Sequence, residues 1–198
     1  MSMHQYFVIH KPYGMLSQFT REGGHLALAD LPFDFPHDVY PVGRLDQDSE
    51  GLLIITNDNY FKNTLLSPNR KHFKSYLVQV DGAITDEALA QLRSGVSIKH
   101  NKKKVLTAPA KASHFTGINP PERDPPVRFR KNIPTSWLVL EISEGKNRQV
   151  RKMTAAVGFP TLRLIRTHIG ELSLDFLGES LVKEMSKGEI YHKCGIKA

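Results

Sequence analysis

A run of four apolar residues at 52–55 places the strongest constraint on the fold, because it follows directly on a charged segment. Residues 43–51 read GRLDQDSEG. A short apolar run bounded by turn-forming residues predicts a buried strand. On extended backbone, side chains two positions apart point the same way, so Arg44 and Asp46 are expected to project together beside that strand. This arrangement suits a catalytic acid with a cationic neighbour.

Hydrophobic periodicity predicts five strands and three helices in this chain. Strands are expected at about 5–10, 52–56, 74–81, 136–143 and 161–169, and helices at about 58–66, 85–94 and 146–157. The helix at 85–94 has the clearest ends, because a threonine precedes acids in its first turn and Gly95 follows its last residue. A basic hairpin or loop is expected over 96–115 and an irregular basic loop over 117–134. The pattern is that of an α+β protein.

Length and composition suit one globular domain over residues 1–198, since 40% of the residues are hydrophobic. With a strand expected from about residue 5, no separate N-terminal RNA-binding domain is expected. No stretch has the length of a signal sequence or a membrane span, so we expect a cytoplasmic protein without a membrane partner. Cys194 is the single cysteine, which excludes an internal disulfide and a cysteine-cluster zinc site. We expect no metal.

The formal net charge of +7 and the pI near 9.5 favour a polyanionic partner. The basic residues gather in clusters at 102–104, at 123–131, at 146–152 and at Arg163 with Arg166. One such cluster is typical of a solvated face. Four clusters in one chain favour a nucleic acid as the partner.

Residues 144–153 read EGKNRQVRKM and are expected to begin a helix. Val150 and Met153 recur at helical spacing and predict an apolar stripe, with Arg148 and Lys152 almost opposite and Arg151 on the flank. Taken alone, this pattern fits an ordinary amphipathic helix with a basic solvent face equally well.

Two shorter segments carry weaker patterns. Lys74 and Tyr76 share one face of a predicted strand, where a tyrosine is usually part of the core or of the sheet surface. Residues 11–14 read KPYG and predict a turn after the first strand.

The segments 11–14, 43–51, 74–76 and 144–153 resemble, in order and spacing, the motifs of the pseudouridine synthases that act on ribosomal RNA. The branch of the family that they resemble is the small-subunit synthase A type. The similarity covers nearly the whole chain, and PTSWL at 134–138 with GFPTLRLIR at 158–166 is most similar to the large-subunit rRNA synthase E group. Members of the family isomerise uridine within RNA by breaking and remaking its glycosidic bond. The resemblance implies an α+β catalytic fold, with a mixed, mainly antiparallel sheet, flanking helices and a central basic active-site cleft.

The resemblance also implies roles for individual residues. Asp46 is expected to be the essential acid, with Tyr76 stacking on the uracil and Arg151 pairing with Asp46. Arg44 is expected to enter the RNA where the target base is flipped out. The other basic residues of the motifs are expected to bind the RNA or the base: Lys11, Lys74, Arg148 and Lys152.

An acid held beside a guanidinium stays ionised, so Asp46 could either add to the ribose or remove its 2′-proton. The sequence does not distinguish between these two roles of Asp46. The reaction exchanges one C–N bond for one C–C bond within a nucleotide, and the family uses no redox cofactor, so no cofactor is expected. The expected substrate is a specific uridine of 23S rRNA, naked or in an assembly intermediate, and the protein is expected to be a monomer.

Two other classes of protein explain part of the pattern. A non-catalytic RNA-binding or ribosome-assembly protein would account for the charge, but it would not need the acid, the tyrosine and the two motif arginines together. A glycosidase or nucleoside hydrolase also breaks a glycosidic bond, but it normally requires a second carboxylate. Asp48 and Glu50 are the candidates nearby, and both are interpreted as solvated turn residues.

Overall fold

The computed structural model describes residues 4–127, 130 and 133–197, and these form two compact units. The first unit runs from the N-terminal end to His72 and resumes at Arg166, and the second is Phe73–Ile165. Strand β9 (Thr161–Ile169) contributes residues 161–165 to the second unit and residues 166–169 to the first. The single catalytic domain over 1–198 stays a prediction.

The first unit is a sheet in the strand order β11-β1-β3-β9, with β2 also pairing with β3 and β10 with β9. Strand β1 lies between two antiparallel neighbours, β3 and β11. Besides its part of β9, the unit contains β1 (Tyr6–Lys11), η1 (Leu28–Asp30), β2 (Tyr40–Pro41), β3 (Glu50–Thr56), α1 (Asn59–Leu66), β10 (Leu172–Ser173), η2 (Leu174–Leu177), β11 (Val182–Glu184) and α4 (Lys187–Lys193).

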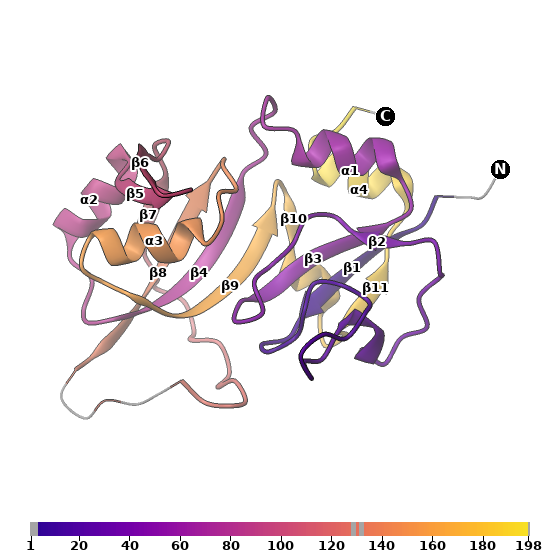
Figure 1. Ribbon diagram of the computed structural model, residues 1–198, viewed down its shortest axis with the longest axis horizontal. Helices are drawn as coiled ribbons and strands as arrows, with labels where there is room; N and C mark the ends of the chain where they lie inside the picture. Colours follow the sequence, from indigo (N-terminus) through magenta and orange to yellow (C-terminus); the bar gives the residue numbers. More distant parts are fainter. Residues whose placement is uncertain (1–3, 128–129, 131–132, 198) are drawn as a thin grey trace. The chain divides into compact units, whose positions relative to one another are not determined.

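Both faces of this sheet are buried. Successive side chains of a strand point to opposite faces, and successive residues of β1 and β3 are buried. On one face, alternate residues of β1 and β3 pack beneath α1 and α4, which lie side by side (Figure 1). On the other face, the intervening residues pack against the segment 15–39. The residues in the first set are Tyr6, Val8, Leu52 and Ile54, and those in the second set are Phe7, Ile9, Leu53 and Ile55.

The second unit is a sheet in the order β9-β4-β8-β7, accompanied by the separate hairpin β5-β6. Helices α2 and α3 and the hairpin share one hydrophobic core with one face of β4 and β8. The elements of the unit are β4 (Lys74–Asp81), α2 (Asp86–Ser94), β5 (Ser97–His100), β6 (Lys103–Leu106), β7 (Lys111–His114), β8 (Thr135–Ile142) and α3 (Gln149–Ala156).

The predicted α+β class with a mainly antiparallel sheet is confirmed. The helix predicted at 85–94 has the expected start and end, since α2 runs from Asp86 to Ser94. The Thr85 hydroxyl caps its start by accepting from the Ala88 N–H at 3.3 Å. The third helix begins at Gln149, later than predicted, because Arg148 adopts a left-handed conformation. Helix α4 was not predicted, although Ser186 and Glu189 form a capping box at its start.

The predicted basic hairpin is β5-β6, and the chain forms a further strand, β7, before residue 115. The described residues of the predicted loop at 117–134 include no helix or strand, and Arg128 and Lys131 lie outside the described residues. In the described part of the chain, no helix has both the length and the apolar character needed to cross a membrane.

A buried carboxylate joins three elements of the first unit. Asp58 accepts hydrogen bonds from the hydroxyls of Tyr6 on β1 and Tyr191 on α4, both at 2.6 Å, and caps α1 by accepting from the Phe61 N–H at 3.0 Å. Burial by itself would raise the pKa of Asp58, but the hydrogen bonds from the two tyrosines and Phe61 outweigh it, so the pKa is lowered. Burial and the Asp58 carboxylate together raise the pKa of Tyr191 to about 12.

Replacing Tyr191 with phenylalanine should lower the free energy of unfolding by about 2 kcal/mol near neutral pH, because a hydrogen bond to a buried carboxylate is lost. The lowered pKa of Asp58 means that the ionised network stabilises the protein above the unfolded-state pKa and weakens as pH falls through the folded-state pKa. Urea unfolding of both proteins should therefore show a gap that narrows in acid. Tyr60→Phe is the control, because Tyr60 is 58% exposed, and an equal loss there would contradict the prediction.

Candidate active site

The segment that carries Asp46 is a loop ending in a turn, held to the segment 11–17 by hydrogen bonds. The Ser17 hydroxyl donates to the Leu45 carbonyl at 2.8 Å and accepts from the Leu45 N–H at 3.0 Å. The Ser49 N–H donates to the Asp46 carbonyl at 3.0 Å and closes the turn. Leu45 is buried, Arg44 is exposed and Asp46 is half-buried, so the side chains alternate as extended backbone predicts.

Lys11 supports this loop from within the first unit. Its side chain is 0% exposed, and its Nζ donates to the carbonyls of Met15 at 2.7 Å, Pro12 at 2.8 Å and Gln47 at 3.4 Å. The Gln47 carbonyl also accepts from the Gly14 N–H at 2.9 Å. One ammonium group thus ties the end of β1, the following turn and the residue next to Asp46 together.

This placement corrects the expectation that Lys11 binds RNA, because a fully buried ammonium with three carbonyl acceptors has no surface to offer a phosphate. Burial lowers the pKa of Lys11 to about 8, although the carboxylates of Glu50, Asp48 and Asp46 favour its charged form. Glu50 is itself only 5% exposed at the start of β3, so its interpretation as a solvated residue is wrong.

The backbone of β3 passes directly against that of β9 where the loop ends. Gly51 has a φ of +107°, and a Cβ added there would overlap the backbone of Arg166. Only glycine tolerates both the positive φ and the close approach of the Arg166 backbone. Arg166 is buried, and its Nε donates to the Leu52 carbonyl at 2.8 Å. Arg163 is buried too, and its Nη1 donates to the Pro121 carbonyl at 2.6 Å, so this pair is not the exposed basic cluster that the sequence suggested.

In the second unit, Lys74 and Tyr76 lie on one face of β4, as predicted. Tyr76 is 8% exposed and belongs to the core cluster shared with α2 and α3. Its partner across the strands is Leu140, and that of Lys74 is Ile142. The tyrosine ring is therefore held by packing on the sheet, as a stacking platform requires.

The turn before α3 is fixed by the Glu144 carboxylate. Its Oε2 accepts from Gln149 Nε2 and pairs with Lys146 Nζ, both at 2.6 Å, and its Oε1 accepts from the Ala108 N–H at 3.1 Å. Burial would raise the pKa of Glu144, but these partners lower it. Arg148 then adopts the left-handed conformation, with a φ of +51°, and its side chain is exposed.

The basic residues of α3 differ in their surroundings. Lys152 folds back toward the start of its own helix, where its Nζ donates to the Asn147 carbonyl at 2.7 Å. Arg151 is half-buried, and its Nη1 donates to the Thr161 carbonyl at 3.4 Å, at the start of β9. Val150 and Met153 form the predicted apolar stripe in the core.

The expected site residues are thus divided between the units. Lys11, Arg44 and Asp46 belong to the first, whereas the second contains Lys74, Tyr76, Arg148, Arg151 and Lys152. Their assembly into one catalytic site, and the cleft that would hold it, stay predictions. Among the described residues, no group of three or more His, Cys, Asp or Glu side chains is placed to hold a metal ion.

Three residues whose hydrogen bonds hold the Asp46 loop in place could not be recognised from the sequence. They are Ser17 and His25, which lie outside the loop, and Gln47, which lies within it. Gln47 Nε2 donates to the Gly14 carbonyl at 3.2 Å and lies 2.7 Å from His25 Nδ1. Neither periodicity nor spacing marks these residues, because their contacts join segments that are remote in the sequence.

Comparison with known proteins identifies the class to which this fold and these motifs belong. A family model described as RNA pseudouridylate synthase matches residues 5–156, so the chain belongs to this family and is a pseudouridine synthase. It is 49% identical over 179 residues to the ribosomal large subunit pseudouridine synthase E of Vibrio parahaemolyticus serotype O3:K6 (strain RIMD 2210633), covering 90% of this chain and 72% of that protein. The protein of the same name from Xanthomonas axonopodis pv. citri (strain 306) is 47% identical, covering 86% and 88%.

Solved structures agree with the fold. A structure described as the crystal structure of pseudouridylate synthase superposes with a TM-score of 0.78 at 26% identity, over 98% of this chain and 75% of the other. Human RNA pseudouridylate synthase domain containing 1 shares the fold, with a TM-score of 0.57 at 14% identity, over 85% and 76%.

The lowered pKa of Lys11 predicts opposite pH trends for stability and activity. Between pH 8 and 10.5 the unfolded chain keeps a proton that folded Lys11 has lost, so this group makes the free energy of unfolding rise with pH. Relative to Lys11→Met, the unaltered protein should gain up to about 3 kcal/mol over this window, measured by urea unfolding.

The rate at which the unaltered protein forms pseudouridine should fall between pH 8 and 10.5. Neutral Lys11 has two N–H groups for three carbonyls and no charge to face the nearby carboxylates, so it holds the Asp46 loop less firmly. Single-turnover measurements check this. A stability difference between the two proteins that does not change with pH would contradict the lowered pKa.

Proposed function

We propose that this protein converts a specific uridine of large-subunit (23S) ribosomal RNA to pseudouridine, with Asp46 as the essential acid. The observation that carries the proposal is the 49% identity, over 90% of the chain, to a protein named ribosomal large subunit pseudouridine synthase E. We infer that the enzyme acts as a cytoplasmic monomer on naked rRNA or on an assembly intermediate.

The surroundings of Asp46 support its role as the acid. The residue lies in a turn whose backbone is fixed by Ser17 and Lys11, and its side chain remains half-buried. The fixed backbone limits where the carboxylate can lie before substrate binds, and attack on a ribose or removal of its 2′-proton requires a positioned acid. Because the target base is stacked in RNA, it has to be flipped out to reach Asp46.

The roles of the other site residues follow from the family resemblance. Tyr76 is proposed to stack on the uracil, and Arg151 to stabilise the Asp46 carboxylate. Arg44 and Arg148, both exposed, are proposed to contact the RNA, with Lys74 and Lys152 beside the base.

The hairpin β5-β6 is proposed to bind RNA phosphates. Lys99 and Lys104 lie directly opposite each other and are both exposed, and Lys102 and Lys103 add two more exposed charges at the turn. Like charges in opposite positions destabilise a hairpin. A bound polyanion would offset this repulsion between the lysines. A hairpin with a purely structural role would gain no stability from placing two lysines opposite each other. The basic loop at 123–131 is also proposed to bind RNA phosphates. One of its residues, Arg130, pairs with Asp81 at 2.8 Å within the second unit.

Asp46→Asn should lower the rate of pseudouridine formation by at least about a thousandfold, because the amide can neither attack nor accept a proton. Affinity for rRNA should stay within a few-fold, since no phosphate contact is removed. The measurement is tritium release from rRNA labelled at uridine C5, with Asp34→Asn as the control, since Asp34 is an exposed acid. Full activity in Asp46→Asn would rule out this assignment.

The double variant Lys99→Gln/Lys104→Gln should weaken rRNA binding and reduce the slope of log K against log salt by about 1.5, because two phosphate contacts are lost. Binding titrations at several salt concentrations measure the slope. Lys187→Gln/Lys197→Gln removes the same charge from exposed positions of the first unit. An equal change of slope in both variants would show that net charge, and not the hairpin, sets the affinity.

A further inference from the structure

The turn Glu22–His25 presents a histidine in a defined position beside the Asp46 loop. Its two central residues, Gly23 and Gly24, have φ values of +59° and +77°, and the His25 N–H donates to the Glu22 carbonyl at 3.1 Å. This is the backbone of a two-residue hairpin turn, which requires positive φ at both central positions. This turn lies outside the four motif segments of the sequence.

The turn is anchored although its tip is exposed. Ala27 and Leu28, which follow it, are both 0% exposed, and the Leu16 N–H donates to the Leu26 carbonyl at 2.8 Å. An ion pair between Arg21 and Asp30 closes the same segment. The residues at 20–26 are all exposed. His25 is thus displayed on a fixed support and not on an unsupported loop.

Gln47 determines which nitrogen of the His25 ring carries the proton. The Gln47 Nε2 lies 3.2 Å from the Gly14 carbonyl, which can only accept, so the amide nitrogen and not its oxygen occupies this position. The second hydrogen of that nitrogen is directed to His25 Nδ1 at 2.7 Å. Nδ1 is therefore the acceptor, and the neutral ring carries its hydrogen on Nε2.

We propose that His25 is a specificity-determining residue, whose Nε2–H donates a hydrogen bond to an acceptor on a nucleotide next to the target uridine. Gln47 is the residue next to Asp46 in the chain, so its contact with the ring gives the donor a defined position relative to the acid within the first unit. The acceptor is a base nitrogen or oxygen, or a phosphate oxygen. This inference rests on the proposed function.

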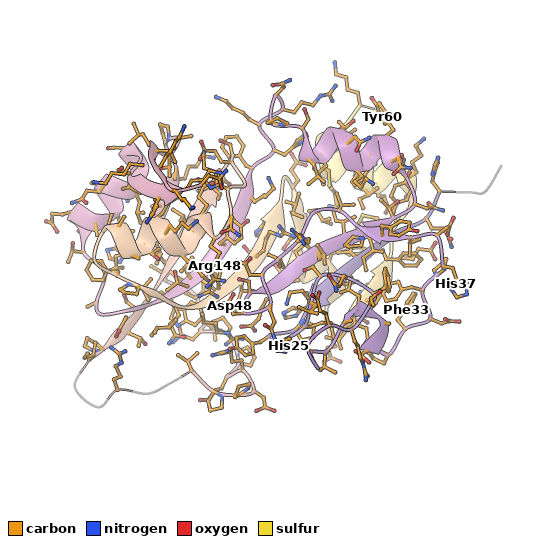
Figure 2. All side chains as sticks on the ribbon, in the orientation of Figure 1. His25, Phe33, His37, Asp48, Tyr60 and Arg148 are labelled. Atoms are coloured by element: carbon orange, nitrogen blue, oxygen red, sulfur yellow. The ribbon has the colours of Figure 1, made fainter. Side chains whose placement is uncertain are left out.

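The test combines protein and RNA variants. The RNA is a fragment of large-subunit rRNA in which the unaltered protein forms pseudouridine. On this fragment, His25→Ala should lower kcat/KM by about tenfold, as expected for one lost hydrogen bond. His37→Ala, which changes another exposed histidine of the first unit, should leave it unchanged (Figure 2).

The RNA variants identify the acceptor. One set replaces each base flanking the target, and another places a methylphosphonate at each flanking phosphate. At one altered position, the kcat/KM of the unaltered protein should fall about tenfold, whereas that of His25→Ala should not fall further. If this position is an altered base, the acceptor is on the base; if it is a methylphosphonate, the acceptor is a phosphate oxygen. A tenfold loss in His25→Ala that persists on every RNA would show a structural role and overturn the proposal.

Two further results would also overturn it. An unchanged kcat/KM in His25→Ala, with pseudouridine still formed by the unaltered protein, would reject the role of His25 alone. Absence of pseudouridine with the unaltered protein would reject the proposed function itself, and this inference with it.

Discussion

The arrangement of the acid-bearing loop depends on one buried ammonium group. Lys11 lies at the end of a strand that is buried on both faces, and it donates to carbonyls of the following turn and of Gln47. Burying a charge is unfavourable unless it is hydrogen-bonded and faces opposite charge. Both conditions are met by the loop that carries Asp46, so the loop and the lysine stabilise each other. Gly51 completes this arrangement by letting β9 approach β3 where the loop ends.

The sequence was sufficient for most of the fold because the strands have a strong pattern. The strand at 74–81 was predicted with the bounds that the structure shows, since it contains the apolar and β-branched residues Tyr76, Leu77, Val78 and Val80. Helix α4 was missed because it is short and its apolar residues, Ile190 and Tyr191, are adjacent and show no helical period. The late start of α3 was not predictable either, because the left-handed conformation of Arg148 accompanies contacts of Glu144 with Gln149 and with the remote Ala108.

The candidate site was predictable by residue type but not by environment. The motifs named Lys11 among the basic residues, yet a lysine in a sequence carries no sign of burial. Its surroundings arise when segments 12–17 and 44–49 fold over it. The same holds for Arg163 and Arg166, which were counted with the surface charge and are buried against backbone carbonyls. Charge clusters in a sequence thus overestimate the exposed basic surface, whereas the hairpin lysines are exposed as counted.

The pairing of β1 with β11 has a consequence for the synthesis of the chain. Phe7 lies opposite Glu184, so β1 has to wait for a segment that is synthesised much later before this edge is covered. The second unit is one continuous stretch of sequence and can form its core earlier during translation. Until then, the apolar residues of β1 depend on the hairpin-like pairing with β3, which makes the nascent first unit the part that most needs protection from aggregation.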